Sequence, residues 1–86
     1  MRLRWTDPAL ADLAELAQRA PVQAAAVVRA VEWLAGLRTP TVGRYVPDLD
    51  ALYWPVPPQG VAYLVDQRGE IVIVGIYDAR RRRQPW

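Results

Sequence analysis

The residues best suited to chemistry gather at one end of the sequence, where four consecutive arginines, Arg80–Arg83, are followed by Trp86. A guanidinium group matches the oxygens of a phosphate with paired N–H donors, and an indole face can stack on a nucleobase. The run therefore predicts contact with a nucleic acid. The alternatives are a basic terminus that aids solubility or meets an acidic partner, and an indole that folds back on the core or is disordered.

Tyr77 ends the apolar stretch before the arginines and is the candidate for proton transfer. The stretch from Glu70 to Tyr77 is rich in β-branched residues, which is typical of a buried strand. Such a strand would deliver the arginines to one edge of the domain. The Tyr77 phenol would act as a general acid or base if adjacent arginines lowered its pKa, and amphipathic packing at the strand end is the alternative.

The sequence contains no cysteine and no histidine, which removes most other kinds of site. Disulfides, thiolate metal ligands and Ser–His or Cys–His nucleophile pairs are excluded. Asp48 and Asp50 are close enough in sequence for a paired carboxylate site, but with no third ligand nearby, loop and turn roles are favoured. We therefore expect no metal and no cofactor.

The net charge of +2 hides an uneven distribution. Residues 80–83 contribute +4, so residues 1–79 carry −2 and the basic character is local. A local charge favours a docking edge over a globally cationic binder. No stretch reaches the ~18 apolar residues of a membrane span, and no signal-peptide pattern opens the sequence. We expect no membrane partner and a cytoplasmic location.

The elements that position these residues begin with a short strand and two helices. Residues 2–5 alternate polar and apolar side chains, as in a half-buried strand. A cap at Thr6 or Asp7 predicts a helix to about residue 20, and Pro21 begins an alanine-rich helix over residues 21–37. The short connection predicts an antiparallel helical hairpin.

The second half of the sequence changes to the pattern of strands and turns. Residues 38–50 have a loop composition, and three strands are predicted after them, at residues 51–56, 61–66 and 70–77. Pro55 cannot donate to a ladder, which predicts an edge or a strand end there. The order β-α-α-β-β-β describes one α+β domain over residues 1–86, with the helical hairpin packed on a small antiparallel sheet.

Some side chains outside the arginine run also receive a prediction. Trp5 and Trp33 are expected in the core, and Asp12 and Glu15 on a solvated helix face. The two consecutive aromatic residues of the strand at 51–56 must point to opposite faces. The outward one would touch RNA or receive a partner segment, or would simply cover the sheet edge.

The sequence resembles RelE/ParE-type toxins of bacterial toxin–antitoxin pairs along essentially its whole length. The resemblance is carried by Trp5–Leu10 with Asp12–Leu13, a long helix, Gly43–Arg44, and the segments Val61–Asp66 and Ile71–Ile76 followed by arginines. It implies a compact α+β toxin that is neutralised by a partner antitoxin wrapping its surface. RelE-like members cleave mRNA in the ribosomal A site, and ParE-like members poison DNA gyrase.

In the RelE-like pattern, an arginine after the last strand is followed six residues later by a tyrosine. Arg80 and Trp86 have that spacing here, with Trp86 in place of the tyrosine, and Arg82 matches a further basic position. An arginine expected on the third strand falls on Gly60, and the lysines of a loop in some members are replaced by the single cation Arg44. The expected catalytic residues are Arg80, Arg82 and Tyr77, and the expected RNA-binding residues are Arg44, Arg81, Arg83 and Trp86.

The leading functional hypothesis is a metal-independent, ribosome-dependent mRNA endonuclease of the RelE-like kind. RNA supplies its own nucleophile, the 2′-hydroxyl, so the protein must only orient the chain and stabilise the strained phosphate. The alternative is a ParE-like gyrase inhibitor without a catalytic site, which Gly60 and the missing tyrosine hydroxyl favour. A degenerate toxin that only binds its antitoxin, or a small interaction domain without toxicity, is the remaining possibility.

Overall fold

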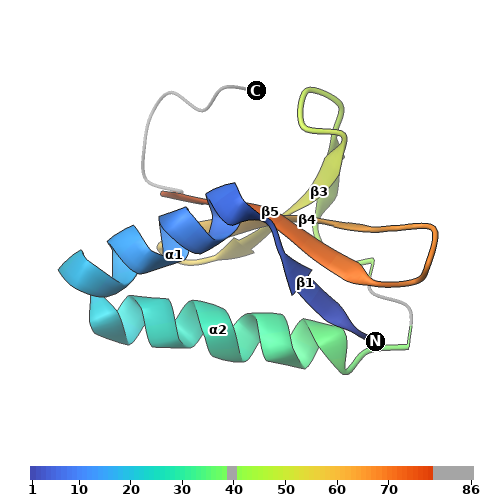
Figure 1. Cartoon of the computed structure of the whole chain (residues 1–86). Coiled ribbons are helices and arrows are strands. Elements are labelled where there is room, and N and C mark those ends of the chain that lie inside the picture. The colour runs from blue at the N-terminus through green and yellow to red at the C-terminus, as the bar shows by residue number, and fades with distance from the viewer. Residues whose placement is uncertain (39–40, 79–86) are drawn as a thin grey trace.

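The structure of the chain is a computed structural model that describes residues 1–38 and 41–78. Two helices and a five-stranded sheet make up this part of the chain (Figure 1). In chain order the elements are β1 (Leu3–Trp5), α1 (Asp7–Arg19), α2 (Pro21–Ala35), β2 (Arg44–Val46), β3 (Ala51–Val56), β4 (Gln59–Val65) and β5 (Ile71–Asp78). The predicted α+β class is confirmed by this arrangement.

The sheet is mixed, with strand order β1-β5-β4-β3-β2. Strands β3 to β5 form the antiparallel meander that the sequence predicts, and β2 adds a further antiparallel strand beside β3. Strand β1 differs, because it pairs in parallel with β5, with Leu3 opposite Ile71 and Trp5 opposite Ile73. The prediction of an antiparallel sheet is therefore correct for the meander and wrong for β1. A parallel partner is possible here because both helices lie between β1 and the meander in the chain.

The helix boundaries follow local capping chemistry. Thr6 is the N-cap of α1, and its Oγ1 accepts the Ala9 N–H over 3.3 Å, with Pro8 in the first turn as predicted. Pro21 begins α2. This helix ends at Ala35, two residues before its predicted end, in a tightened turn in which the Gly36 N–H donates to the carbonyl of Trp33.

Strand β2 lies inside the segment that the sequence analysis assigns to a loop. Its three residues pair with the first half of β3, with Arg44 opposite Tyr53 and Val46 opposite Ala51. The tight turn between them ends at Asp50, whose φ is 49°. Three residues are too few to show the periodicity of a strand in the sequence, and β2 forms because it pairs with β3. Pairing of β2 with β3 extends only as far as Tyr53, so Pro55 lies beyond it and the prediction of an edge position is confirmed.

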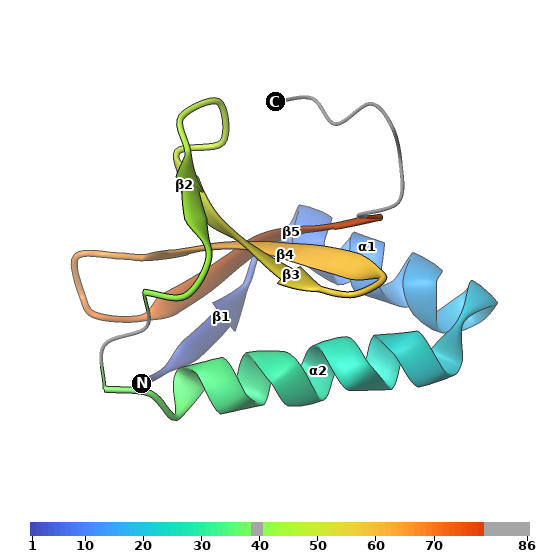
Figure 2. The same cartoon turned by 180° about the vertical axis from the view of Figure 1, so that it is seen from behind.

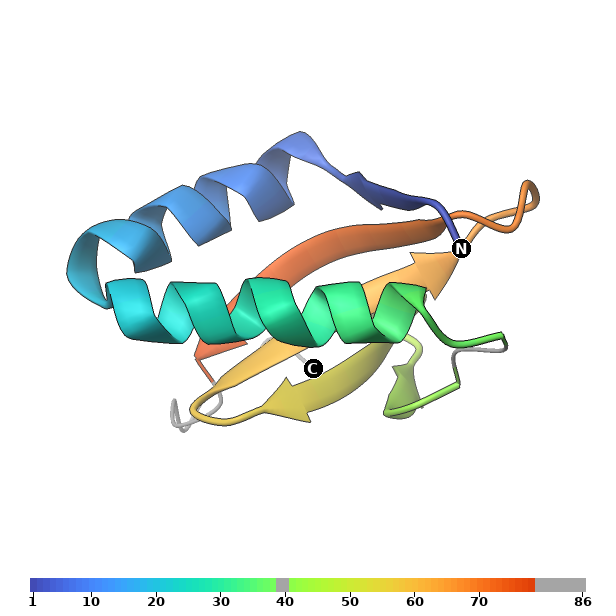
Figure 3. The ribbon, with the colours of Figure 1, turned by 90° about the horizontal axis from the view of Figure 1, so that it is seen from below.

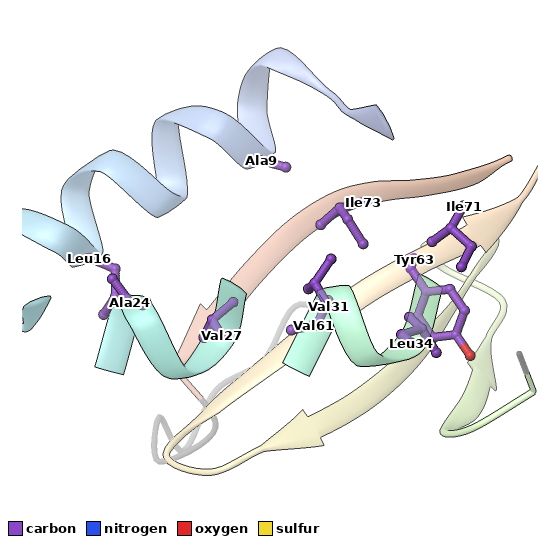
Figure 4. Packing of buried hydrophobic residues seen from close by; sticks show 10 residues of the cluster. All are labelled: Ala9, Leu16, Ala24, Val27, Val31, Leu34, Val61, Tyr63, Ile71 and Ile73. Atoms are coloured by element: carbon purple, nitrogen blue, oxygen red, sulfur yellow. The ribbon is translucent and has the colours of Figure 1, made fainter. Parts of the chain in front are cut away.

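Both helices cover the same face of the sheet (Figure 3). The core lies between these layers, and the predicted stripe of α2 at Val27, Val31 and Leu34 is fully buried in it. The remaining members of the buried cluster, drawn in Figure 4, are Ala9, Leu16, Ala24, Val61, Tyr63, Ile71 and Ile73. Burial of each large aliphatic side chain contributes about 2 kcal/mol to the transfer free energy, so this layer is the main source of stability.

The two tryptophans predicted for the core differ in exposure. Trp5 is partly buried and packs against the core cluster. Trp33 is 54% exposed, so its prediction is wrong. Its ring centroid lies 5.7 Å from that of Trp54 on β3, which itself packs against the core. Pairing of the two indoles removes part of each ring from water without burying Trp33.

None of the helices in the described ranges is long and apolar enough to cross a membrane.

Candidate functional site

The candidate site lies on the sheet face that turns away from the helices, called here the open face. Side chains alternate along a strand, so Val61 and Tyr63 of β4 enter the core while Gly60 and Ala62 belong to the open face. The hairpin of β2 and β3 rises from the sheet on the side opposite α2 (Figures 1 and 2). It therefore bounds the open face on one side.

The centre of the open face is occupied by the side chain of Tyr53. Tyr53 lies on β3, two residues before Pro55, which pairs with Gly60 of β4. A Cβ added at Gly60 would lie 2.0 Å from the Tyr53 hydroxyl oxygen and 2.2 Å from Cζ. The outer end of the Tyr53 ring thus lies directly over Gly60, and Tyr53 is only 6% exposed.

Tyr77 lies beside Tyr53 on the same face. It is the register partner of Gly60, and its ring lies over Gly75, where an added Cβ would be 2.9 Å from the Tyr77 hydroxyl oxygen. The Tyr53 and Tyr77 ring centroids are 6.5 Å apart with 51° between the ring planes. This separation and tilt fall within the range of favourable aromatic pairs.

Arg44 extends this arrangement to β2. Its guanidinium carbon lies 5.9 Å from the centroid of the Tyr53 ring, within the range of a cation–π contact. Arg44 is exposed, and it forms no ion pair with any residue in 1–38 or 41–78. The guanidinium N–H donors can therefore reach a ligand while the ring fixes the side chain on the open face.

Asp12 borders Tyr77 from the side of α1. Its Oδ2 accepts the backbone N–H of Ile76 over 3.0 Å, and the side chain is partly buried. Strand β1 ends opposite Ile73, so at Ile76 helix α1 takes the place of a neighbouring strand. The prediction of a solvated face is therefore wrong for Asp12 and correct for Glu15, which is exposed.

Replacing Asp12 with alanine is expected to lower the free energy of unfolding by about 1–3 kcal/mol, because the Ile76 N–H loses its acceptor. Asp12→Asn should cost less, since the amide carbonyl can still accept that hydrogen bond. Urea denaturation of both variants measures the difference. Equal stability of Asp12→Ala and the unmodified chain would contradict this role.

The electrostatic surroundings of Tyr77 differ from the expectation. Burial raises the pKa of the Tyr77 hydroxyl above its ordinary value of 10.0, and the negative charge of Asp12 raises it further. Among the described residues, nothing lowers it. At neutral pH the phenol is therefore protonated, which suits it to donate a hydrogen bond or a proton and not to accept one as a base.

No protein-family model matches the sequence, and no curated protein does so. Among solved structures, the chain is similar to a chain described as "Chromosomal ParDE TA system from P. aeruginosa". The match has a TM-score of 0.75 and 22% sequence identity, and it covers 93% of this chain and 97% of that chain. The fold is RelE/ParE-like. At this level of identity the likeness concerns the fold.

Within this RelE/ParE-like fold, two of the sequence-predicted site residues lie together. Arg44 and Tyr77 both contact Tyr53 on the open face. The other predicted residues, Arg80, Arg81, Arg82, Arg83 and Trp86, lie outside the described residues. In sequence, the first of these arginines comes two positions after Asp78, the last residue of β5. In the sequence, the arginine run thus follows closely after the strand that carries Tyr77.

Asp48 and Asp50, considered for a carboxylate pair, have the predicted turn character. The Tyr45 hydroxyl donates a hydrogen bond of 2.6 Å to Oδ1 of Asp50. No group of three or more potential metal ligands occurs within residues 1–38 and 41–78. The paired-carboxylate site therefore gains no support from the geometry, and Asp50 belongs to the turn between β2 and β3.

Sequence reasoning did not select Asp12 for the site, and it considered Tyr53 only as one of two aromatics of which the outward one would touch RNA or a partner; Tyr53 lies on the open face but is nearly buried there. A signal for Tyr53 was present, because strand alternation places Tyr53 and Trp54 on opposite faces and the glycine on the next strand leaves space for a large ring. No comparable signal marks Asp12. Its helical position looks solvated, and only the packing of α1 beside β5 brings it to Ile76.

Proposed function

We propose that this chain is the toxin of a type II toxin–antitoxin pair and that it acts through the open face. Two observations support this. The fold is like that of a chain described as part of a ParDE toxin–antitoxin system. The open face carries Arg44, Tyr53 and Tyr77 in contact, with the arginine run starting in sequence just after β5.

Within that class, we propose a metal-independent, ribosome-dependent mRNA endonuclease. The single observation that carries this is the open face itself, where an exposed guanidinium and a protonated phenol lie on either side of Tyr53. A guanidinium group binds phosphate oxygens, and a protonated phenol can supply the proton that a departing alkoxide needs. The strand end that carries the phenol leads in sequence to Arg80 and Arg82.

The reaction would use the RNA 2′-hydroxyl as nucleophile. Its oxygen attacks the adjacent phosphorus, the bond from phosphorus to the 5′-oxygen breaks, and the products are a 2′,3′-cyclic phosphate and a 5′-hydroxyl. Arg80 and Arg82 would stabilise the negative charge that builds on the phosphate oxygens. Tyr77 would donate the proton that the departing 5′-oxygen needs, while a carboxylate or a group of the ribosome accepts the proton of the 2′-hydroxyl.

Arg44, Arg81, Arg83 and Trp86 are proposed to bind the RNA chain. Arginines at these positions would contact phosphates on either side of the cleaved bond, and the Trp86 indole would stack on a base. No metal or cofactor is part of this mechanism, because the 2′-hydroxyl and the arginines provide the nucleophile and the charge stabilisation.

A cognate antitoxin is the proposed protein partner, and the bacterial cytoplasm the proposed location. The similarity to a chain from a ParDE system supports such a partner. Co-expression of this chain with the product of an adjacent short gene tests the proposal. A stable complex that restores growth is expected, and the absence of any protective neighbour would contradict a two-component system.

The second candidate is a ParE-like inhibitor of DNA gyrase, which traps the enzyme without cleaving a nucleic acid itself. The observation that favours it is the ring of Tyr53 over Gly60, which leaves no arginine at that position of the strand. A toxin that has lost its activity and only binds an antitoxin would have the same feature.

Induced expression in a bacterial host separates these functions. Messenger RNA integrity and chromosome breakage are measured in the same culture, within minutes of induction. Rapid mRNA cleavage with intact chromosomes is the expected result. Double-strand breaks linked to gyrase, with intact mRNA, would move the function to the second candidate, and normal growth without either signal would contradict both.

A further inference from the structure

We propose that Tyr53 is a positioning residue that holds Arg44 in place for RNA phosphate binding and sets the place of Tyr77 beside it. Tyr53 itself is nearly buried and contacts no substrate in this scheme. The inference rests on the proposed endonuclease function, because it assigns the RNA contact to Arg44. Its geometric part, the placement of two side chains by one ring, can be tested without any activity.

The first observation is the interlock between Tyr53 and Gly60. The space above Gly60 is filled by the outer end of the Tyr53 ring, at 2.0–2.4 Å from where a Cβ would lie. Gly60 does not have the positive φ that favours glycine, so backbone conformation does not require glycine there. The glycine is needed for space, and the space is used by Tyr53. One pair of residues therefore fixes where this ring lies.

The second observation is the place of Arg44 relative to that ring. Arg44 and Tyr53 are register partners on neighbouring strands, so their side chains leave the sheet side by side. The guanidinium carbon lies 5.9 Å from the ring centroid, and within residues 1–38 and 41–78 no carboxylate pairs with Arg44. The ring is therefore the contact that restricts the Arg44 head group while leaving its N–H donors available.

The third observation is the contact on the other side. Tyr77 is the register partner of Gly60, and Gly60 lies directly beneath the outer end of the Tyr53 ring. The ring centroids of Tyr53 and Tyr77 are 6.5 Å apart. Tyr53 thus contacts both the phosphate-binding and the proton-donating candidates. Removing the ring would free Arg44 and open space beside Tyr77, whereas removing only the hydroxyl would leave both ring contacts in place.

A purely structural role for Tyr53 would give a different pattern of effects. Loss of packing would lower stability and would act independently of Arg44. For ribosome binding, a positioning role makes the effect of Tyr53 depend on Arg44, because the ring acts on phosphate binding through that guanidinium. The relevant variants are therefore Tyr53→Phe, which keeps the ring, Tyr53→Leu, which removes it, and Gly60→Ala, which displaces it.

The geometric part is tested by NMR on the whole chain, with thermal melting by circular dichroism to confirm that each variant folds. The ring current of Tyr53 should shift the Arg44 side-chain protons in the unmodified chain and in Tyr53→Phe. This shift should disappear in Tyr53→Leu and change in Gly60→Ala. Identical Arg44 shifts in folded Tyr53→Leu and the unmodified chain would overturn the proposal.

The functional part is tested by the dependence of mRNA cleavage on the concentration of translating ribosomes. Tyr53→Leu and Arg44→Ala should each raise the half-saturating ribosome concentration about fivefold. The double variant should be no worse than Arg44→Ala alone, and Tyr53→Phe should stay closer to the unmodified chain than Tyr53→Leu does. Independent, multiplying effects would overturn the positioning role. If the unmodified chain does not cleave mRNA at all while the NMR shift is present, the endonuclease function and the RNA role of Arg44 are both overturned and only the placement stands.

Discussion

Replacing Arg80 and Arg82 together with glutamine is expected to lower mRNA cleavage on translating ribosomes by about 100-fold or more. The cleaved phosphate gains negative charge as the 2′-oxygen attacks, and loss of one donor aimed at such charge commonly costs 10²–10³-fold in rate. Because glutamine keeps a polar side chain of similar length, folding should be unaffected. Single-turnover cleavage at saturating ribosome concentration measures the chemical step.

A matched control separates this effect from general charge loss. Arg19 and Arg68 are exposed arginines at the end of α1 and in the turn between β4 and β5. Arg19→Gln with Arg68→Gln removes the same two charges, and its single-turnover rate should be unchanged. An equal loss in both double variants would mean that net charge and not a site is responsible. Full activity of the Arg80 and Arg82 variant would contradict the proposed mechanism.

Replacing Tyr77 with phenylalanine is expected to lower the cleavage rate by about 100-fold, the usual effect of losing one proton-transfer group. The ring is retained, so the contact with Tyr53 and the packing over Gly75 should persist. Burial and the charge of Asp12 raise the pKa of the Tyr77 hydroxyl above 10.0, so the phenol stays protonated below that pH. Its contribution as an acid should therefore be constant between pH 7 and 9.

Tyr63→Phe is the control for loss of a tyrosine hydroxyl. Tyr63 is fully buried on the core side of the sheet, and its hydroxyl donates to the carbonyl of Val42 over 2.6 Å. This variant should be less stable by about 1 kcal/mol but should cleave mRNA at the normal rate. A rate for Tyr77→Phe equal to that of the unmodified chain would show that the proton comes from elsewhere, such as the ribosome.

The helices and long strands were predictable because several local signals agree there. Thr6, Pro8 and Pro21 mark helix starts by capping and by fixed backbone angles, and the structure has both starts where these residues place them. The turn before β5 is similar. Gly69 has a φ of 79°, and Asp66 accepts the N–H groups of Arg68 and Glu70, both at 2.9 Å. Such features depend on residues adjacent in sequence.

The features that could not be predicted all depend on contacts between distant segments. Strand β2 exists because Arg44 to Val46 pair with β3. The parallel pairing of β1 requires β5, which is distant in sequence, to lie beside it. Trp33 has the apolar character of a core residue, yet it is 54% exposed and pairs with Trp54. Local pattern gives the type of an element but not which of its sides meets the rest of the chain.

The site shows the same division. Arg44 and Tyr77 could be selected by residue chemistry, because an isolated cation in a loop and a phenol at a strand end are visible in the sequence. Their connection through Tyr53 could not, since it depends on the register that brings Gly60 under that ring. The lowered Tyr77 pKa considered from the sequence does not agree with the described residues, because the sequence does not reveal that this phenol is partly buried and that Asp12 faces it.

The central claim is that the open face is the working surface of an RNA-cleaving toxin. Its most direct test is addition of the purified chain to ribosomes stalled with a defined codon in the A site, followed by analysis of the mRNA ends. The account predicts fragments that end in a 2′,3′-cyclic phosphate and begin with a 5′-hydroxyl, formed by the unmodified chain and strongly reduced with Tyr77→Phe. Intact mRNA, or cleavage that is equally fast with Tyr77→Phe and with the Arg80 and Arg82 double variant, would contradict it.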